Sequence, residues 1–254
     1  MNSSKRKIIT GGIVAVLGIA LLAYVVHVLT AALDSKPGDV SKAQFVVQLG
    51  ADEKLTNVTA DRTLTLDFGE PFTHAPTGRT LPQLVTVTDV YTLKNTGSEE
   101  LSRRVFFPVN YLSSDDERIS ITLDGKAAGR WYSVGEQPFV DGSAFGSDIE
   151  SGKYYKTALE NATHSGEGFA YYVIELTLKA GQSAELRLEY PLENASSILL
   201  LNDESTVACD SSRLIINDPN RIKLSCSDEA VAVSEYGGEL DLSEGPEQFT
   251  INIG

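Results

Sequence analysis

The sequence predicts an all-β domain behind a single N-terminal transmembrane helix, and three observations lead to this prediction. A long apolar run without charges opens the chain. After it, short segments alternate apolar and polar residues, which is the pattern of half-buried β-strands. Clusters of Gly, Pro, Asn and Asp separate these segments about every 8–12 residues, as in β-sandwiches and barrels.

The apolar run covers residues 8–33 and carries no formal charge at pH 7. As an α-helix it would extend about 39 Å, enough to cross a hydrocarbon core about 30 Å thick. Three basic residues precede the run and Asp34 follows it. The positive-inside rule therefore predicts a cytoplasmic tail at residues 1–7 and an extracellular domain after the helix. A cleaved signal peptide is the alternative, but its apolar region usually has only about 7–15 residues.

The chain beyond the apolar run is strongly acidic. Residues 34–254 hold all 35 acidic side chains and 18 of the 21 Lys and Arg residues, which gives a formal charge of −17. This charge opposes binding to nucleic acid or to an anionic membrane surface, and it favours cationic partners. Residues 34–41 form a short polar linker with Pro and Gly, so the folded domain is expected close to the membrane.

The clearest strand pattern lies at residues 84–93, where apolar side chains alternate with threonines and Asp89 interrupts the apolar face. The polar stretch Asn95–Gly97 is expected to form a turn before a second strand. Proline donates no amide hydrogen to a sheet, so Pro108 is expected to end that second strand or to place it at an edge.

A hairpin and a long connection are expected further along. The pair Asp124-Gly125 follows an alternating segment and is preferred where a tight hairpin turn needs positive φ. Residues 127–168 lack alternation, and a connection of this length in a compact domain is either functional or disordered. We expect a β-sandwich at residues 42–192 that includes this long loop, and further strands at 193–254 in the same or a second domain.

Two stretches carry a recurring set of turn and core residues. Residues 87–109 contain Y-x-L-x-N-x-G followed by F-P, and residues 174–192 contain L-x-A-G-x-x-x-x-L-x-x-x-Y. These stretches resemble the extracellular immunoglobulin-like domains of Gram-positive surface proteins, many of unknown function. The resemblance implies an immunoglobulin-like β-sandwich ectodomain, either one large sandwich or two small ones. It implies no catalytic or binding residue, because any sandwich would keep such turn and core residues.

The chain has two cysteines, Cys209 and Cys226, and both fall in the predicted extracellular part. An even pair in an oxidising compartment predicts one disulfide, worth about 3 kcal/mol in the chain-entropy model. A zinc site is not expected, because two cysteines without a nearby His pair do not supply four ligands.

A membrane-anchored enzyme is the alternative to a binding protein. Sortase-like transpeptidases resemble this chain in their N-terminal anchor, external β-barrel and order of His, Cys and Arg, here His164, Cys209 and Arg213 or Arg221. A thiolate beside a cation can perform acyl transfer. However, Ala208 replaces the Thr that precedes the Cys in that family, and the His lies in a Gly-rich segment. We therefore expect no catalytic residue and no enzymatic activity.

The long loop holds the candidate binding residues. Trp131, Tyr132, Phe139 and Phe145 could stack on sugars or anchor a protein partner, or they could pack the loop onto the sheet. The segment 141–152 matches an EF-hand loop in part, but a Gly replaces the bidentate Glu at its end. A looser calcium site at Asp141, Asp148 and Glu150 is the alternative to a solvated acidic loop. The expected protein has no metal and no cofactor.

These features together predict a membrane-anchored extracellular protein that binds a partner in a bacterial cell envelope or forms part of its structure. Its expected position is the cell membrane of a Gram-positive bacterium, held by a single span. Its expected ligand is a protein or a cell-wall glycan, and nucleic acid is not expected because the extracellular part is so acidic.

Overall fold

The computed structural model divides the chain into two compact units, Met1–Asp39 and Val40–Gly254. It describes residues 44–254 apart from residues 53, 76, 112–117, 134–154, 156–167, 194, 203–206, 228–233 and 244–247. The expected tail, transmembrane helix and linker, residues 1–41, lie outside the described residues. Among the described residues, no helix is long and apolar enough to cross a membrane.

One layer of the second unit is a seven-stranded sheet with the order β16-β14-β3-β6-β12-β8-β9. The bounds are β3 (Val58–Phe68), β6 (Leu84–Asn95), β8 (Ser120–Leu123), β9 (Lys126–Ala127), β12 (Ser183–Glu193), β14 (Ser211–Asn217) and β16 (Gly238–Asp241). Its strands are antiparallel except for the parallel pair of β3 and β14. Buried positions alternate along β3 and β6, which confirms the strand patterns read from the sequence.

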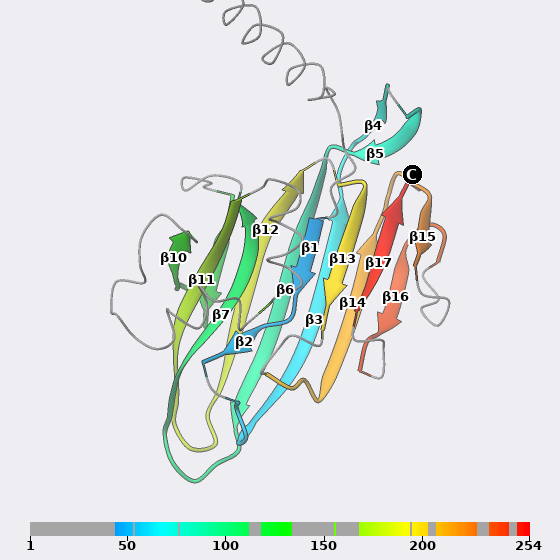
Figure 1. Ribbon diagram of the computed structural model, residues 1–254. Coiled ribbons are helices and arrows are strands. Elements are labelled where there is room, and N and C mark those ends of the chain that lie inside the picture. Colours follow the sequence, from blue (N-terminus) through cyan, green and yellow to red (C-terminus); the bar gives the residue numbers. More distant parts are fainter. Residues whose placement is uncertain are drawn as a thin grey trace, which may run out of the picture. The chain divides into compact units, whose positions relative to one another are not determined.

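The opposite layer consists of two four-stranded sheets, with the orders β1-β13-β17-β15 and β10-β11-β7-β2 (Figure 1). The first contains β1 (Gln44–Val47), β13 (Ser197–Leu201), β15 (Leu224–Cys226) and β17 (Gln248–Ile253). The second contains β2 (Gly50–Ala51), β7 (Leu101–Tyr111), β10 (Arg130–Ser133) and β11 (Gly168–Leu178). The chain passes from one sheet to the other at Gln48 and Leu49, between β1 and β2.

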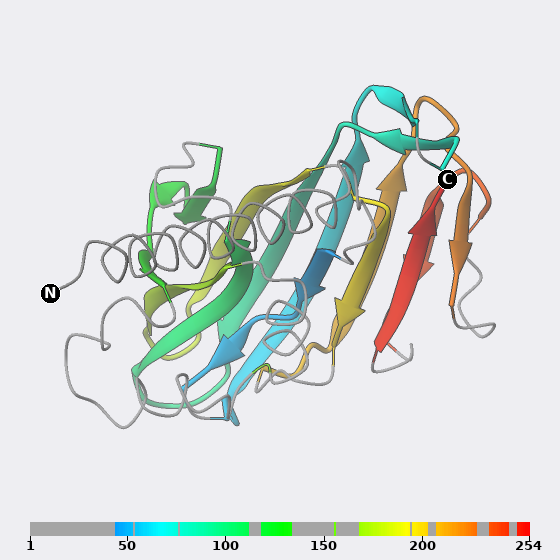
Figure 2. The same cartoon turned by 45° about the horizontal axis from the view of Figure 1, so that its top comes forward.

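The two layers stack on each other (Figure 2), and buried side chains from both layers pack together in one core cluster. Phe107 on β7 stacks on Tyr172 of the neighbouring strand and on Tyr190 of β12 in the opposite layer, with ring centroids 5.5 and 6.1 Å apart. The prediction of an all-β domain is therefore confirmed for the described residues. The finer prediction of an immunoglobulin-like sandwich stays a prediction, and each layer has one parallel strand pair, unlike the antiparallel sheets of immunoglobulin domains.

The two stretches that resemble surface proteins form arches between the layers. β6 ends at Asn95, the first residue of the predicted turn. It pairs with β3 and β12, whereas the following β7 pairs with β11 and β2. β11 and β12 also lie in different layers. The buried Asn95 side chain ties the two arches together, because it donates to Glu99 O at 2.8 Å and to Leu178 O at 3.0 Å.

The structure confirms the expected hairpin and decides between the two alternatives for Pro108. β8 and β9 pair around Asp124 and Gly125, whose φ angles are 50° and 72°. Of the two alternatives for Pro108, the end of the strand is wrong, since β7 continues to Tyr111. The edge position is confirmed, because β2 pairs with β7 only at Val105 and Phe106, and at Pro108 β7 pairs with β11 alone among the described residues. Arg104 O accepts from an amide on the β2 side, so by alternation the nitrogen of Pro108 also faces that side. The missing amide hydrogen therefore does not interrupt the pairing of β7 with β11.

A separate two-stranded sheet, β4 (Pro71–His74) and β5 (Arg79–Pro82), lies beside the C-terminal end of β17 (Figure 1). Its Arg79 donates to Ser196 O at 3.2 Å, to Gly254 O at 3.1 Å and to Ile253 O. Strands β13 and β14 pair with β1 and β3, so residues 193–254 contribute to the same sheets as the preceding part of the chain.

Candidate functional site

An ion pair is buried between the two layers. Arg62 on β3 and Asp89 on β6 occupy positions whose side chains point into the core, and these side chains are 0% and 1% exposed. Arg62 Nε donates to Asp89 Oδ1 at 2.9 Å, and Arg62 Nη2 donates to Asp89 Oδ2 at 2.8 Å. This bidentate geometry satisfies a guanidinium and a carboxylate that are both removed from water.

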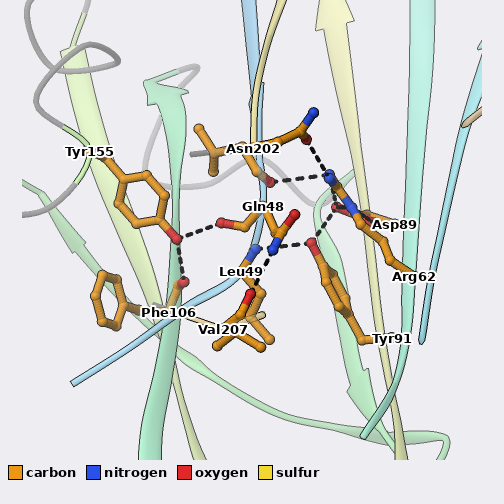
Figure 3. Close-up of polar contacts among 10 residues, drawn as sticks. Gln48, Leu49, Arg62, Asp89, Tyr91, Phe106, Tyr155, Asn202 and Val207 are labelled. Carbon is orange, nitrogen blue, oxygen red and sulfur yellow. Dashed lines mark hydrogen bonds and ion pairs between the residues drawn. The ribbon is translucent and has the colours of Figure 1, made fainter. Parts of the chain in front are cut away.

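The ion pair continues into hydrogen bonds that reach the opposite layer (Figure 3). The Tyr91 hydroxyl donates to Asp89 Oδ2 at 2.9 Å and accepts from the Leu49 amide at 2.9 Å. Arg62 also donates from Nη1 to the side-chain oxygen of Asn202 at 3.0 Å. The network therefore joins the seven-stranded sheet to the segment between β1 and β2 and to the connection that follows β13.

The electrostatics of this network favour a fixed structural role. Burial by itself lowers the pKa of Arg62, but the neighbouring Asp89 and Tyr91 together outweigh it, and the net pKa lies above the ordinary value. Burial also raises the pKa of Tyr91 well above its usual range. At neutral pH the guanidinium therefore stays charged and the phenol keeps its hydrogen, so neither group is poised to exchange a proton.

Two long connections meet at the segment between β1 and β2. The Gln48 side chain donates to Val207 O, in the connection between β13 and β14, at 2.6 Å. The Tyr155 hydroxyl, from the connection between β10 and β11, donates to Gln48 O at 2.6 Å. These partners are 159 and 107 residues apart in the sequence. Figure 3 shows Tyr155 and Val207 pointing toward Gln48 from different sides.

The predicted binding residues are placed only in part. Trp131 and Tyr132 belong to β10, where they lie opposite Tyr172 and Tyr171 of β11. The other two, Phe139 and Phe145, lie outside the described residues. The segment 141–152 and His164 of the calcium and sortase-like interpretations also lie outside them.

The structure does not form the predicted disulfide, and Cys209 and Cys226 are both free. The strand pairing explains this difference. Cys209 lies two residues before β14, which pairs with β3 in the seven-stranded sheet. Cys226 lies on β15 opposite Ile251, in one of the four-stranded sheets of the other layer.

The environment of Cys209 does not favour a sortase-like mechanism. Burial is the largest influence on this thiol and raises its pKa to about 11, although Arg62 acts in the opposite direction. A catalytic thiolate needs a lowered pKa instead. The two candidate arginines have other partners, since Arg213 pairs with Glu239 at 3.1 Å and Arg221 lies over the Tyr236 ring at 5.2 Å.

The raised pKa predicts slow modification of Cys209 and a loss of stability in alkali. In the native full-length protein at pH 8, an iodoacetamide-type reagent should modify Cys209 more slowly than a free thiol peptide. The folded protein keeps the thiol proton up to about pH 11, whereas the unfolded chain loses it near pH 9. Stability from this group is therefore complete below pH 9 and decreases as the pH rises toward 11. Labelling as fast as that of the peptide would contradict the prediction.

A polar groove of about 460 Å³ lies over β3, β14 and β16. Arg213 and Glu239 form their exposed ion pair within it, and Asp61 lines it from β3. The backbone amide of Ser243 donates to Asp241 and thereby lowers the pKa of this carboxyl. The described residues contain no group of three or more His, Cys, Asp or Glu that could hold a metal ion. The charged and hydroxyl side chains that line the groove can offer hydrogen bonds and charges to a partner.

The sequence contains a signal for the buried ion pair that the strand predictions did not use. Asp89 falls on the same face of its strand as Val87 and Tyr91, and Arg62 falls on the same face as Leu64. A charged residue at a core-facing position requires a partner of opposite charge nearby. Tyr155 gives no comparable signal, because the residues around it show no period.

No protein-family model and no characterised protein matches the sequence. Among solved structures, a candidate nutrient-binding protein from Legionella pneumophila is similar over 83% of this chain and 70% of that chain, with 11% identity and a TM-score of 0.45. An M1 zinc metallopeptidase from Deinococcus radiodurans is similar over 79% of this chain and 43% of that chain, with 12% identity and a TM-score of 0.31. Similarities this low do not bear on function. The fold and the site define a two-layer all-β protein with a buried polar network.

Proposed function

We propose that the protein is a membrane-anchored extracellular protein that binds a partner in a bacterial cell envelope or forms part of its structure. The observation that carries the proposal is the contact of Tyr155, a residue of the β10–β11 connection, with the two-layer scaffold. This connection contains Phe139 and Phe145, and it starts directly after Trp131 and Tyr132 on β10. Tyr155 fastens it to the backbone of Gln48. Binding residues on a connection that a rigid scaffold holds are a common arrangement in β-proteins.

The sequence supports a location for the protein and a chemical class for its partner. The uncharged run at residues 8–33 and the basic residues before it support a single span with the folded part outside the cell. The aromatic residues suit a protein or a cell-wall glycan, since aromatic rings anchor both kinds of ligand. The formal charge of −17 on residues 34–254 disfavours nucleic acid.

A sedimentation assay tests the proposal. The full-length protein in a mild detergent should co-sediment with purified Gram-positive cell walls, and Trp131→Ala should raise the apparent Kd for the walls at least about fivefold, as expected for an aromatic anchor worth about 1 kcal/mol or more. Tyr236→Ala is the control, because Tyr236 is an exposed aromatic at 44% that precedes β16, a strand of a different sheet from β10. Walls stripped of protein by protease distinguish a glycan ligand from a protein ligand. Wild-type protein that stays in the supernatant with intact walls would refute envelope binding.

A further inference from the structure

Tyr155 has an unusual backbone conformation for a bulky residue. Its φ is 53°, in the left-handed region that residues other than Gly, Asn and Asp seldom adopt. Its side chain is buried, with 1% of the residue exposed. It is the one residue that the structure describes between β10 and β11. Residues are held in such a conformation only where the surrounding contacts determine it.

The Tyr155 side chain packs against β7 and the β1–β2 segment on the outer side of their layer, and we call these contact residues its receptor. Phe107 faces the opposite layer through Tyr190, so by alternation Phe106 faces outward. The Tyr155 ring meets the Phe106 ring edge-on at 5.8 Å, and its hydroxyl lies 3.4 Å from Phe106 O and donates to Gln48 O at 2.6 Å. Both carbonyls belong to the scaffold.

Gly50 belongs to the receptor because its missing side chain leaves room for the Tyr155 hydroxyl group. A Cβ built on Gly50 would lie 2.6 Å from the Tyr155 hydroxyl oxygen and 3.2 Å from Cζ of Phe106. Gly50 is not among the glycines with a positive φ, so alanine suits its backbone conformation. The requirement for glycine at this position is therefore the space that the Tyr155 hydroxyl occupies.

We propose that Tyr155 is a positioning residue that clasps the β10–β11 connection to the sheet, with Gly50 as its receptor. The clasp lies beside the predicted binding residues, because the Tyr155 ring is 6.5 Å from that of Tyr171, which lies opposite Tyr132 in the β10–β11 pair. The role in binding rests on the proposed function, whereas the clasp itself does not. Under this proposal, a substitution in β2 changes the position of a connection about 100 residues further along the chain.

Limited proteolysis of the full-length protein with mapped fragments tests the clasp. Gly50→Ala should increase cleavage within residues 134–167 at least tenfold, without comparable new cleavage in the strands. Tyr155→Phe alone should increase it about threefold, because the ring stays but the hydrogen bond to Gln48 O is lost. The double variant should be cleaved less than Gly50→Ala alone, because removal of the hydroxyl oxygen relieves the contact with the new methyl group. Tyr236→Phe is the control and should match the wild type.

Three outcomes overturn the clasp. They are unchanged cleavage in Gly50→Ala, cleavage that increases equally throughout the domain, and a double variant in which the two effects simply multiply. Cell-wall binding is measured on the same samples. Binding that is absent from the wild type counts against the proposed function and leaves the cleavage result to decide the clasp. Local cleavage together with unchanged wall binding would overturn the positioning role.

Discussion

Asp89→Ala is expected to lower the free energy of unfolding by about 3–5 kcal/mol, because it leaves the Arg62 guanidinium buried without its counterion. The substitution also removes the acceptor of the Tyr91 hydroxyl. Since neither charge contacts solvent, added salt should change this difference little. Urea unfolding of the full-length protein in detergent, followed by far-ultraviolet circular dichroism, measures the effect.

Two comparisons show whether the effect comes from an uncompensated buried charge. The double variant Arg62→Met with Asp89→Leu removes both charges and should be more stable than Asp89→Ala, because an apolar pair of similar volume often replaces a buried ion pair at little cost. Arg187→Met breaks an exposed pair with Glu189, 46% and 41% exposed, and should cost less than about 1 kcal/mol. A loss below 1 kcal/mol for Asp89→Ala would show that the buried ion pair contributes little to the stability of the domain.

Local sequence patterns predicted the strands of this fold but not their partners. The alternation at residues 84–93 and the Asp124-Gly125 pair act within a few residues, and the structure confirms both. A polar break between two strands has the same local appearance in a hairpin and in an arch between layers. The strand pairing that decides between them depends on contacts far apart in sequence. This is why the sequence predicted a turn between the two strands but not that β6 and β7 lie in different layers.

Less of the candidate site than of the fold could be predicted, because most of its contacts join residues far apart in the sequence. The core-facing positions of Arg62 and Asp89 could have been read from the alternation of their strands, which indicates that a buried counterion is needed. The contact of Tyr155 with Gln48 spans 107 residues and depends on the missing side chain of Gly50. The predicted disulfide is absent from the structure, because an even number of cysteines does not determine which strands carry the two thiols.

Asn95→Ala is expected to lower the free energy of unfolding by about 2–4 kcal/mol. The buried amide donates to Glu99 O and Leu178 O, and its oxygen accepts from the Gly97 amide at 2.9 Å. Loss of the side chain removes these bonds in both arches at once. The same urea unfolding experiment measures this loss.

Asn95→Asp and Asn217→Ala make the origin of the effect clear. Asn95→Asp keeps the size and one oxygen of the side chain but turns a second oxygen toward two carbonyl groups, so it should be at least as destabilising as alanine. Asn217 donates to Asp67 Oδ1 at 2.7 Å on the exposed face of the sheet, where water can replace the bond, so Asn217→Ala should cost less than about 1 kcal/mol. If Asn95→Asp were as stable as the wild type, the two carbonyl contacts would not hold the arches, and the shape of the side chain alone would explain its burial.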